Sequence, residues 1–147
     1  MAPLRYLEDF EVGQRFELGS FSLTAEEIVA FAERYDPQSF HLESDPDGPF
    51  GGLIASGWQT GSECHVLMVE ALLKDTACLG SPGVDRIRWL KPVRPDVVYT
   101  LTLTIAEVVP SRKRPDRGRV NSHLMLTDPV GAPVYTMDGI TIVSRKA

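Results

Sequence analysis

The chain is poor in cysteine, and its two thiols form no recognisable pattern. Among 147 residues only Cys64 and Cys78 are cysteines, without a CxxC pair or Cys/His ligand spacing. A disulfide framework and a zinc site are therefore disfavoured, and both cysteines are expected to be small core residues. Motifs for other metals, nicotinamides and flavins are also missing, so we expect that the protein uses no cofactor.

The sequence also lacks a long apolar run and a targeting signal. No apolar run approaches the ~20 residues of a membrane span, and residues 1–15 have no signal-peptide pattern. We therefore expect a cytoplasmic protein without a membrane partner. The net charge of −5 disfavours nucleic acid as a partner.

Positive charge is nevertheless concentrated in one stretch, where only Asp116 provides a counter-charge. Its basic residues are Arg112, Lys113, Arg114, Arg117 and Arg119. The stretch is either a solvated hairpin loop or a site for a phosphorylated ligand, and the sequence leaves both interpretations open.

Residues 24–35 predict a helix that ends at Asp36. Thr24 and Glu27 have the spacing of a capping box, and apolar residues follow at helical intervals. Pro37 disfavours the helical conformation for the residue before it, so the Asp36 side chain should project from a fixed corner. His41 follows after a short, turn-rich segment, close enough for both side chains to converge on one water.

A second helix is expected to begin at Ser56 and Gly57. The segment Ser56 to Gln59 has the form of another capping box, which makes Ser56 the N-cap and Gly57 the first helical residue. The first helical turn has unpaired N–H groups and the positive end of the helix dipole, and glycine permits close approach of a ligand. With Asp36 and His41, these N–H groups can activate a water and stabilise a carbonyl oxygen that gains negative charge.

The remaining pattern predicts a sheet around this helix. Residues 57–74 read as a helix whose second half is apolar almost all round, so it must be enclosed by protein. Residues 1–11 read as an irregular lead-in, 13–18 as an edge strand, and 85–90, 99–105, 120–127 and 134–143 as alternating strands. This order predicts an α+β fold, with a curved antiparallel sheet around a central helix, in a single domain over residues 1–147.

Four segments together resemble the MaoC-like acyl dehydratases, relatives of the (R)-specific enoyl-CoA hydratases. They are Asp36 to His41, Phe50 to Trp58, Ser81 to Pro95 and Ser111 to Gly118, within a similarity that extends from Tyr6 to Val143. The resemblance implies a hotdog fold and a homodimer or dimer-based oligomer with active sites near the interface. It also implies a lyase of fatty acid metabolism that acts on acyl-CoA thioesters.

The resemblance assigns roles to individual residues. Asp36 and His41 would activate water for addition to C3 of a trans-2-enoyl thioester, with proton delivery to C2. The Gly57 N–H would polarise the thioester carbonyl, and coenzyme A would enter only as part of the substrate. Further candidate substrate contacts are Ser56 and Trp58 and, for the CoA phosphates, Arg88, Lys91, Arg94, Arg112 and Arg114.

The chain departs from the family pattern in one place. Relatives usually read Asp-x-Asn-Pro-apolar-His, whereas Gln38 and Ser39 stand here in place of Asn-Pro. Two alternatives therefore stay open: a thioesterase that uses Glu63 on the central helix, and an acyl-thioester binding module without turnover.

Other side chains have more ordinary interpretations. His65 is expected to be a core histidine, unless it faces the substrate channel, and His123 is expected to be structural. Trp58 and Trp89 are expected in the core or in a dimer contact.

Overall fold

The chain folds as an antiparallel sheet wrapped around one long helix. The computed structural model describes residues 3–147, so the first two residues of the expected lead-in lie outside the described residues. The elements are η1 (Leu7–Asp9), β1 (Arg15–Phe21), α1 (Ala25–Tyr35), α2 (Ser39–Leu42), α3 (Gly57–Ala71), η2 (Leu73–Asp75), β2 (Cys78–Trp89), β3 (Tyr99–Pro110), β4 (Arg117–Thr127) and β5 (Pro133–Ser144). The strands lie in the order β1-β3-β4-β5-β2, with every neighbouring pair antiparallel.

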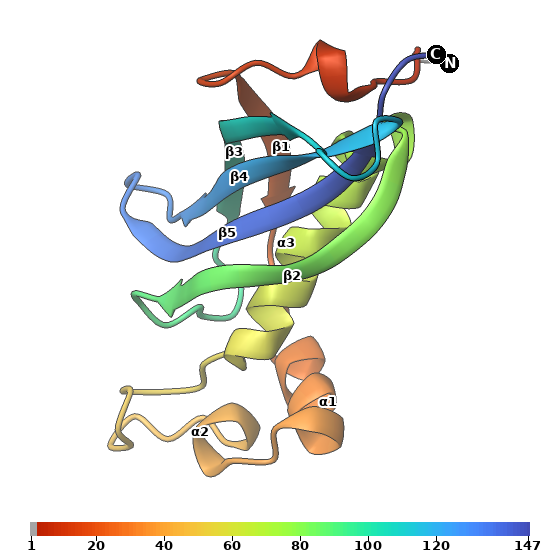
Figure 1. Ribbon diagram of the computed structural model, residues 1–147. Helices are drawn as coiled ribbons and strands as arrows, with labels where there is room; N and C mark the ends of the chain where they lie inside the picture. Colours follow the sequence, from red (N-terminus) through yellow and green to blue (C-terminus); the bar gives the residue numbers. More distant parts are fainter. Residues whose placement is uncertain (1–2) are drawn as a thin grey trace.

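The arrangement confirms the predicted α+β hotdog fold. Figure 1 shows the curved sheet around α3, with α1 and α2 beyond one end of the sheet. Alternate residues of β4 are buried, as the period-two pattern requires, because successive strand side chains point to opposite faces. The core on the α3 side of the sheet includes Leu101, Leu103, Ile105, Leu124 and Leu126, all at most 1% exposed.

The predicted strands are correct in type but too short. β1 continues through Gly19 to Phe21, with a register shift between Glu17 and Gly19. β2 begins at Cys78 rather than Asp85, because it tolerates several register shifts along β5 that a strict alternation pattern misses.

The helix α3 is not enclosed on every side, and this prediction was wrong. It ends at Ala71, before the expected Lys74, and continues as the short η2 turn. His65 is exposed and Val66 is 54% exposed, so His65 is not a core histidine. It lines a cavity between α3 and β2, the alternative position that the sequence analysis allowed. The sheet covers the side of α3 that carries Cys64, Leu67 and Met68. The opposite face remains open beside the edge strand β2.

The two cysteines differ in environment, although both are free thiols. Cys64 is buried, and burial raises the pKa of its thiol to about 12. Cys78 is exposed at the start of β2, so its assignment to the core was wrong. Within residues 3–147, no helix is both long enough and apolar enough to cross a membrane.

Candidate active site

The end of α1 fixes the position of Asp36. The predicted capping box is present: Thr24 Oγ1 accepts from the Glu27 N–H at 3.1 Å, and Glu27 Oε1 accepts from the Thr24 N–H at 3.0 Å. The helix stops where Pro37 predicts, with Asp36 as its C-cap at φ −155°. The Asp36 N–H still donates to the carbonyl oxygen of Ala32 at 2.9 Å, so its backbone is anchored to the helix.

A one-turn helix that the sequence did not predict positions His41. The turn-rich segment forms α2, in which His41 is 5% exposed and Phe40 packs edge-on against its ring at 4.5 Å. His41 Nδ1 lies 2.7 Å from the carbonyl oxygen of Ile54. Because a carbonyl only accepts, Nδ1 carries the hydrogen and Nε2 is the nitrogen free to exchange a proton. That Nε2 lies 3.3 Å from Asp36 Oδ2.

The two oxygens of Asp36 have separate partners. Oδ1 accepts from Gln38 Nε2 at 2.6 Å, and Oδ2 accepts from Ser56 Oγ at 2.7 Å. The Gln38 bond is the largest cause that lowers the pKa of the Asp36 carboxyl; Ser56 and His41 act in the same direction, and burial opposes them. Asp36 is therefore a carboxylate at neutral pH.

Ser56 and Gly57 begin α3 as predicted, but the second capping box does not form. Ser56 Oγ accepts from the Trp58 N–H at 3.3 Å, whereas Gln59 Nε2 donates to the carbonyl oxygen of Glu27 at 3.1 Å. Gln59 is buried against α1, so its amide cannot turn back to the N-cap. Within residues 3–147 the Gly57 N–H has no hydrogen-bond acceptor.

An indole lies directly against Gly57. Trp89 Nε1 donates to the Gly57 carbonyl oxygen at 2.9 Å, and a Cβ placed on Gly57 would lie 2.3 Å from a Trp89 ring carbon. Trp58 packs edge-on against Trp89 with ring centroids 5.3 Å apart. Their exposures of 59% and 46% show that neither indole is a core residue, so that part of the prediction was wrong.

Asp36, His41 and Gly57 line one cavity of about 450 Å³. The structure thus brings together the three groups that the sequence analysis selected. A second cavity of about 480 Å³ adjoins it and shares Gly57, Trp58 and Trp89 as lining residues.

The basic candidates near the end of β2 are only partly at the site. Lys91 lines the cavity of Asp36 and forms an ion pair with Asp128 at 2.9 Å. Arg94 donates to the Phe50 carbonyl oxygen on the rim, and Arg88 donates to that of Ile87 without lining either cavity.

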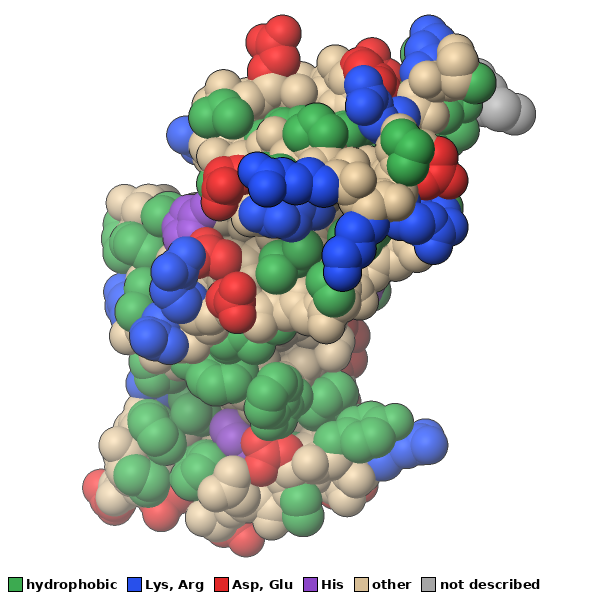
Figure 2. Space-filling view, in the orientation of Figure 1, with side chains coloured by type: hydrophobic (Ala, Val, Ile, Leu, Met, Phe, Trp, Pro, Cys, Tyr) green, Lys and Arg blue, Asp and Glu red, His purple; other side chains and the backbone are tan. Residues whose placement is uncertain are grey.

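Arg112 and Arg114 lie in the β3–β4 hairpin. This position agrees with the first of the two interpretations in the sequence analysis, a solvated hairpin loop. Arg112 lines a separate cavity of about 460 Å³. β4 runs from this hairpin toward the site over Arg117–Thr127, roughly 35 Å at about 3.4 Å per residue. Figure 2 shows basic side chains gathered over the upper part of one face, above a mainly hydrophobic region. Arg112 and Arg114 therefore do not reach Asp36 of their own chain.

Glu63 and His123 lie outside this constellation. Glu63 lines neither of the two adjoining cavities described within residues 3–147, and burial and nearby Glu27 raise the pKa of its carboxyl. His123 Nδ1 pairs with Asp138 at 2.7 Å on the face of the sheet away from α3.

Sequence reasoning missed three contributors to the site: the Gln38 amide, the Phe40 ring and the Ile54 carbonyl. The position of Gln38 within the motif was a usable signal, because it lies two residues after Asp36. The Ile54 contact had no local signal, since it joins residues 13 apart.

Comparison with known proteins places the chain in a family. No family model matches it. It is 31% identical over 108 residues to the uncharacterized protein YdeM of Bacillus subtilis, covering 72% of this chain and 77% of that protein. It is 32% identical to the solved MaoC-like dehydratase from Rhodospirillum rubrum, with a TM-score of 0.88 over 97% of this chain and 99% of that one.

A more distant solved structure shares the fold. The R-hydratase PhaJ1 from Pseudomonas aeruginosa superposes with a TM-score of 0.75 at 19% identity, covering 96% of this chain and 86% of that one. The similarity to the Rhodospirillum rubrum protein extends over nearly the whole of both chains. The chain belongs to the MaoC-like dehydratase family.

Proposed function

We propose that the protein is a lyase that interconverts trans-2-enoyl-CoA and (R)-3-hydroxyacyl-CoA. The observation that supports this most strongly is the Asp36 carboxylate 3.3 Å from His41 Nε2, in one cavity with the unpaired Gly57 N–H. Addition of water to a conjugated thioester requires a general base that removes a proton from the water, and a hydrogen-bond donor that stabilises the oxyanion as it develops. The Asp36–His41 pair and the Gly57 N–H can supply these two groups.

The proposed reaction proceeds by addition of one water. Asp36 and His41 remove a proton as the water oxygen bonds to C3. The electrons of the C2–C3 double bond shift toward the thioester, whose oxygen becomes negative and is stabilised by the Gly57 N–H. The Asp36–His41 pair then returns a proton to C2. Neither metal nor redox cofactor takes part in this scheme, and coenzyme A is the carrier of the substrate.

The direct test is the ultraviolet absorbance of crotonyl-CoA mixed with purified protein. Loss of the conjugated enoyl absorbance without free CoA is the result expected for hydration. Release of free CoA would instead identify a thioesterase. Glu63 is not placed to act on a thioester bound in either cavity, because it lines neither of them. Binding without either signal would identify the non-catalytic module.

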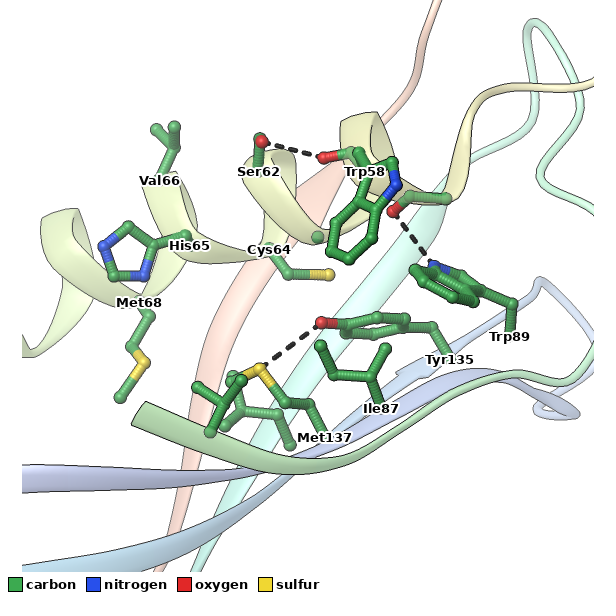
Figure 3. Close-up of a pocket in the computed structure, with 14 residues that line it drawn as sticks. Trp58, Ser62, Cys64, His65, Val66, Met68, Ile87, Trp89, Tyr135 and Met137 are labelled. Carbon is green, nitrogen blue, oxygen red and sulfur yellow. Dashed lines mark hydrogen bonds between the residues drawn. The ribbon is translucent and has the colours of Figure 1, made fainter. Parts of the chain in front are cut away.

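The second cavity is the proposed site for the acyl chain. Figure 3 shows Tyr135, Ile87 and Met137 of the sheet facing Cys64 and Trp58 of α3 across this space. Its volume of about 480 Å³ lies within the usual range of small-molecule sites, and its lining is predominantly apolar. It adjoins the cavity of Asp36 and shares Gly57, Trp58 and Trp89 with it, so an acyl chain bound there would lie next to the reacting carbons.

The variant Gly61→Val is expected to shorten the preferred substrate. A Cβ at Gly61 would lie 3.4 Å from Tyr135 Oη, and the branched side chain would extend farther into the cavity. Hydration of trans-2-decenoyl-CoA should fall about tenfold or more relative to crotonyl-CoA, as lost apolar contacts and a clash predict. Steady-state rates on both substrates measure this ratio. An equal loss of hydration rate on the two thioesters would show that the acyl chain binds outside this cavity.

A second copy of the chain is the proposed partner of β2. Among residues 3–147 the strand β2, Cys78–Trp89, pairs only with β5, so its other side is a free sheet edge that can accept another strand. Leu79, Val84 and Trp89 are 46–47% exposed on it. Two-fold pairing of this edge is antiparallel, and it would bring the start of one β2 beside the end of the other.

This dimer would change the position of the basic hairpin relative to the site. The start of β2 lies beside the hairpin, because Cys78 pairs with Val143 and Arg117 pairs with Ser144. In a two-fold dimer, Arg112 and Arg114 of one copy therefore move toward the Asp36 cavity of the other, where CoA phosphates require positive charge.

Val84→Lys is expected to convert this dimer into monomers. The substitution places a charge on the free edge of β2, which opposes strand pairing. Sedimentation velocity measures the change in mass. Val130→Lys is the matched control, since Val130 is 87% exposed in the turn before β5 and should leave the mass unchanged. A wild-type monomer at micromolar concentration would contradict the proposed interface.

A further inference from the structure

Gln38 is bonded to both members of the Asp36–His41 pair. Its Nε2 donates to Asp36 Oδ1 at 2.6 Å, and its backbone N–H donates to the Asp36 carbonyl oxygen at 2.8 Å. Its own carbonyl oxygen accepts from the His41 N–H at 3.0 Å. We propose that Gln38 is a positioning residue that holds Asp36 and His41 in register for water activation, an inference that rests on the proposed function.

The side-chain bond controls which oxygen of Asp36 faces the imidazole. Oδ1 is held by Gln38, which leaves Oδ2 to Ser56 Oγ at 2.7 Å and to His41 Nε2 at 3.3 Å. A carboxylate bound on one oxygen only can rotate about its Cβ–Cγ bond, because this torsion is soft. Gln38 and Ser56 together prevent that rotation and keep one oxygen directed toward the water.

The backbone bonds relate the two segments to each other. Gln38 is the N-cap residue of α2, with φ −93° and ψ 147°, and α2 carries His41. Asp36 belongs to the end of α1. Since Gln38 bonds to the backbone of both, it sets the separation of the carboxylate and the imidazole, as well as the direction of the carboxylate.

The proposed role of Gln38 explains how the site accommodates Gln38-Ser39 in place of the Asn-Pro of the family pattern. Glutamine retains the amide donor of asparagine with one more methylene, and here that donor reaches Asp36 Oδ1. Ser39 begins α2 in place of proline, and its carbonyl oxygen accepts from the Glu43 N–H at 2.9 Å, so the helical turn still closes. The altered pair therefore supports the hydratase rather than an idle binding module.

Few charged groups surround Asp36, so a change in its pKa can be attributed to the loss of a single hydrogen bond. His41 of α2 faces its Oδ2, and Lys91, after β2, lines the same cavity while paired with Asp128. The residues that α3 presents to Asp36 are uncharged: Ser56 donates to it, and Gly57 lines the cavity. Loss of the Gln38 donor should raise the pKa of Asp36, because that bond is the largest cause of its depression.

The test compares Gln38→Met, Gln38→Glu and Gln38→Asn with the control Gln14→Met. Gln14 Oε1 also accepts a local bond, from the Glu11 N–H at 3.2 Å, but it lies outside the site. The measurements are the pH profile of kcat/KM for crotonyl-CoA and the carboxyl titration of Asp36 by carbon-13 NMR. Circular dichroism establishes that each variant is folded.

Gln38→Met should lower kcat/KM by between about tenfold and a hundredfold, as expected for a misplaced reacting group. Its acid limb and the Asp36 titration should both move to higher pH. Gln38→Glu should move them further, because two carboxyls at hydrogen-bond distance share a proton. Gln38→Asn should recover part of the loss, and Gln14→Met should match the wild type.

The NMR titration separates this inference from the proposed function. An unmoved Asp36 titration in both Gln38→Met and Gln38→Glu would overturn the role of Gln38, whatever the turnover. An unmoved kcat/KM in an active enzyme would also overturn it. If the titration moves but the wild type hydrates no enoyl-CoA, Gln38 still holds Asp36 and only the hydratase assignment fails.

Discussion

Asp36→Asn is expected to lower kcat for crotonyl-CoA hydration between about 100-fold and 10,000-fold, the usual contribution of a general acid or base. The amide has the shape of the carboxylate but cannot take a proton from water. His41→Ala should cause a loss of similar size, because it removes the Nε2 that lies 3.3 Å from Asp36 Oδ2. The decrease in ultraviolet absorbance of crotonyl-CoA at neutral pH measures both effects, and circular dichroism establishes that each variant is folded.

The chain offers a matched control for this pair. His123 and Asp138 form another imidazole–carboxylate contact, at 2.7 Å, on the face of the sheet away from α3. His123→Ala should therefore keep the wild-type rate. If His123→Ala lost as much activity as His41→Ala, the losses would reflect the sheet rather than the site, and the assignment of Asp36 and His41 would be wrong.

The same pair predicts the acid side of the pH profile. Hydrogen bonding to Gln38, with smaller contributions from Ser56 and His41, lowers the pKa of the Asp36 carboxyl. The carboxylate should thus persist to lower pH than an ordinary aspartate, and activity should fall only as the pH drops through this depressed pKa. The stability that the ionised group contributes is present above the unfolded-state pKa and is lost over the same descent.

Gly57→Ala is expected to lower kcat/KM between about 100-fold and 1,000-fold, the range seen when one oxyanion donor is lost. The added Cβ would lie 2.3 Å from a ring carbon of Trp89, so either the indole or the first turn of α3 must move. Movement of that turn redirects the Gly57 N–H. Because Trp89 Nε1 also bonds to the Gly57 carbonyl oxygen, indole fluorescence should change with activity.

Gly61→Ala is the control on the same helix. Its Cβ would lie 3.4 Å from Tyr135 Oη, which is an ordinary contact at the edge of the tight range, and it is one turn away from the N-terminus of α3. Crotonyl-CoA hydration should stay near the wild-type rate. Full activity in Gly57→Ala would show that the thioester oxygen is bound elsewhere.

Several elements could be predicted because their causes are local. The Thr24–Glu27 capping box and Pro37 bound α1 at both ends, since each acts within three residues of the element it delimits. The alternation in β3, β4 and β5 identified three neighbouring strands, as each has one face against the core. β2 was found only in its second half, because edge strands tolerate irregular pairing.

Other errors arose where a local pattern competed with packing. Gln59 has the spacing of a capping residue, yet burial against α1 directs its amide to the Glu27 carbonyl oxygen. His65 lies in an apolar run, yet it is exposed, because the sheet does not close around that face of α3.

The amino-acid order alone determined the chemical groups of the site and the helix ends that present them. Asp36 and His41 are five residues apart, and the stop before Pro37 limits where their side chains can reach. Contacts across longer separations depended on tertiary packing. Ser56 reaches Asp36 across 20 residues, and Trp89 reaches Gly57 across 32. Such contacts exist only because α3 and the sheet bring distant segments together, and local sequence preferences do not encode that placement.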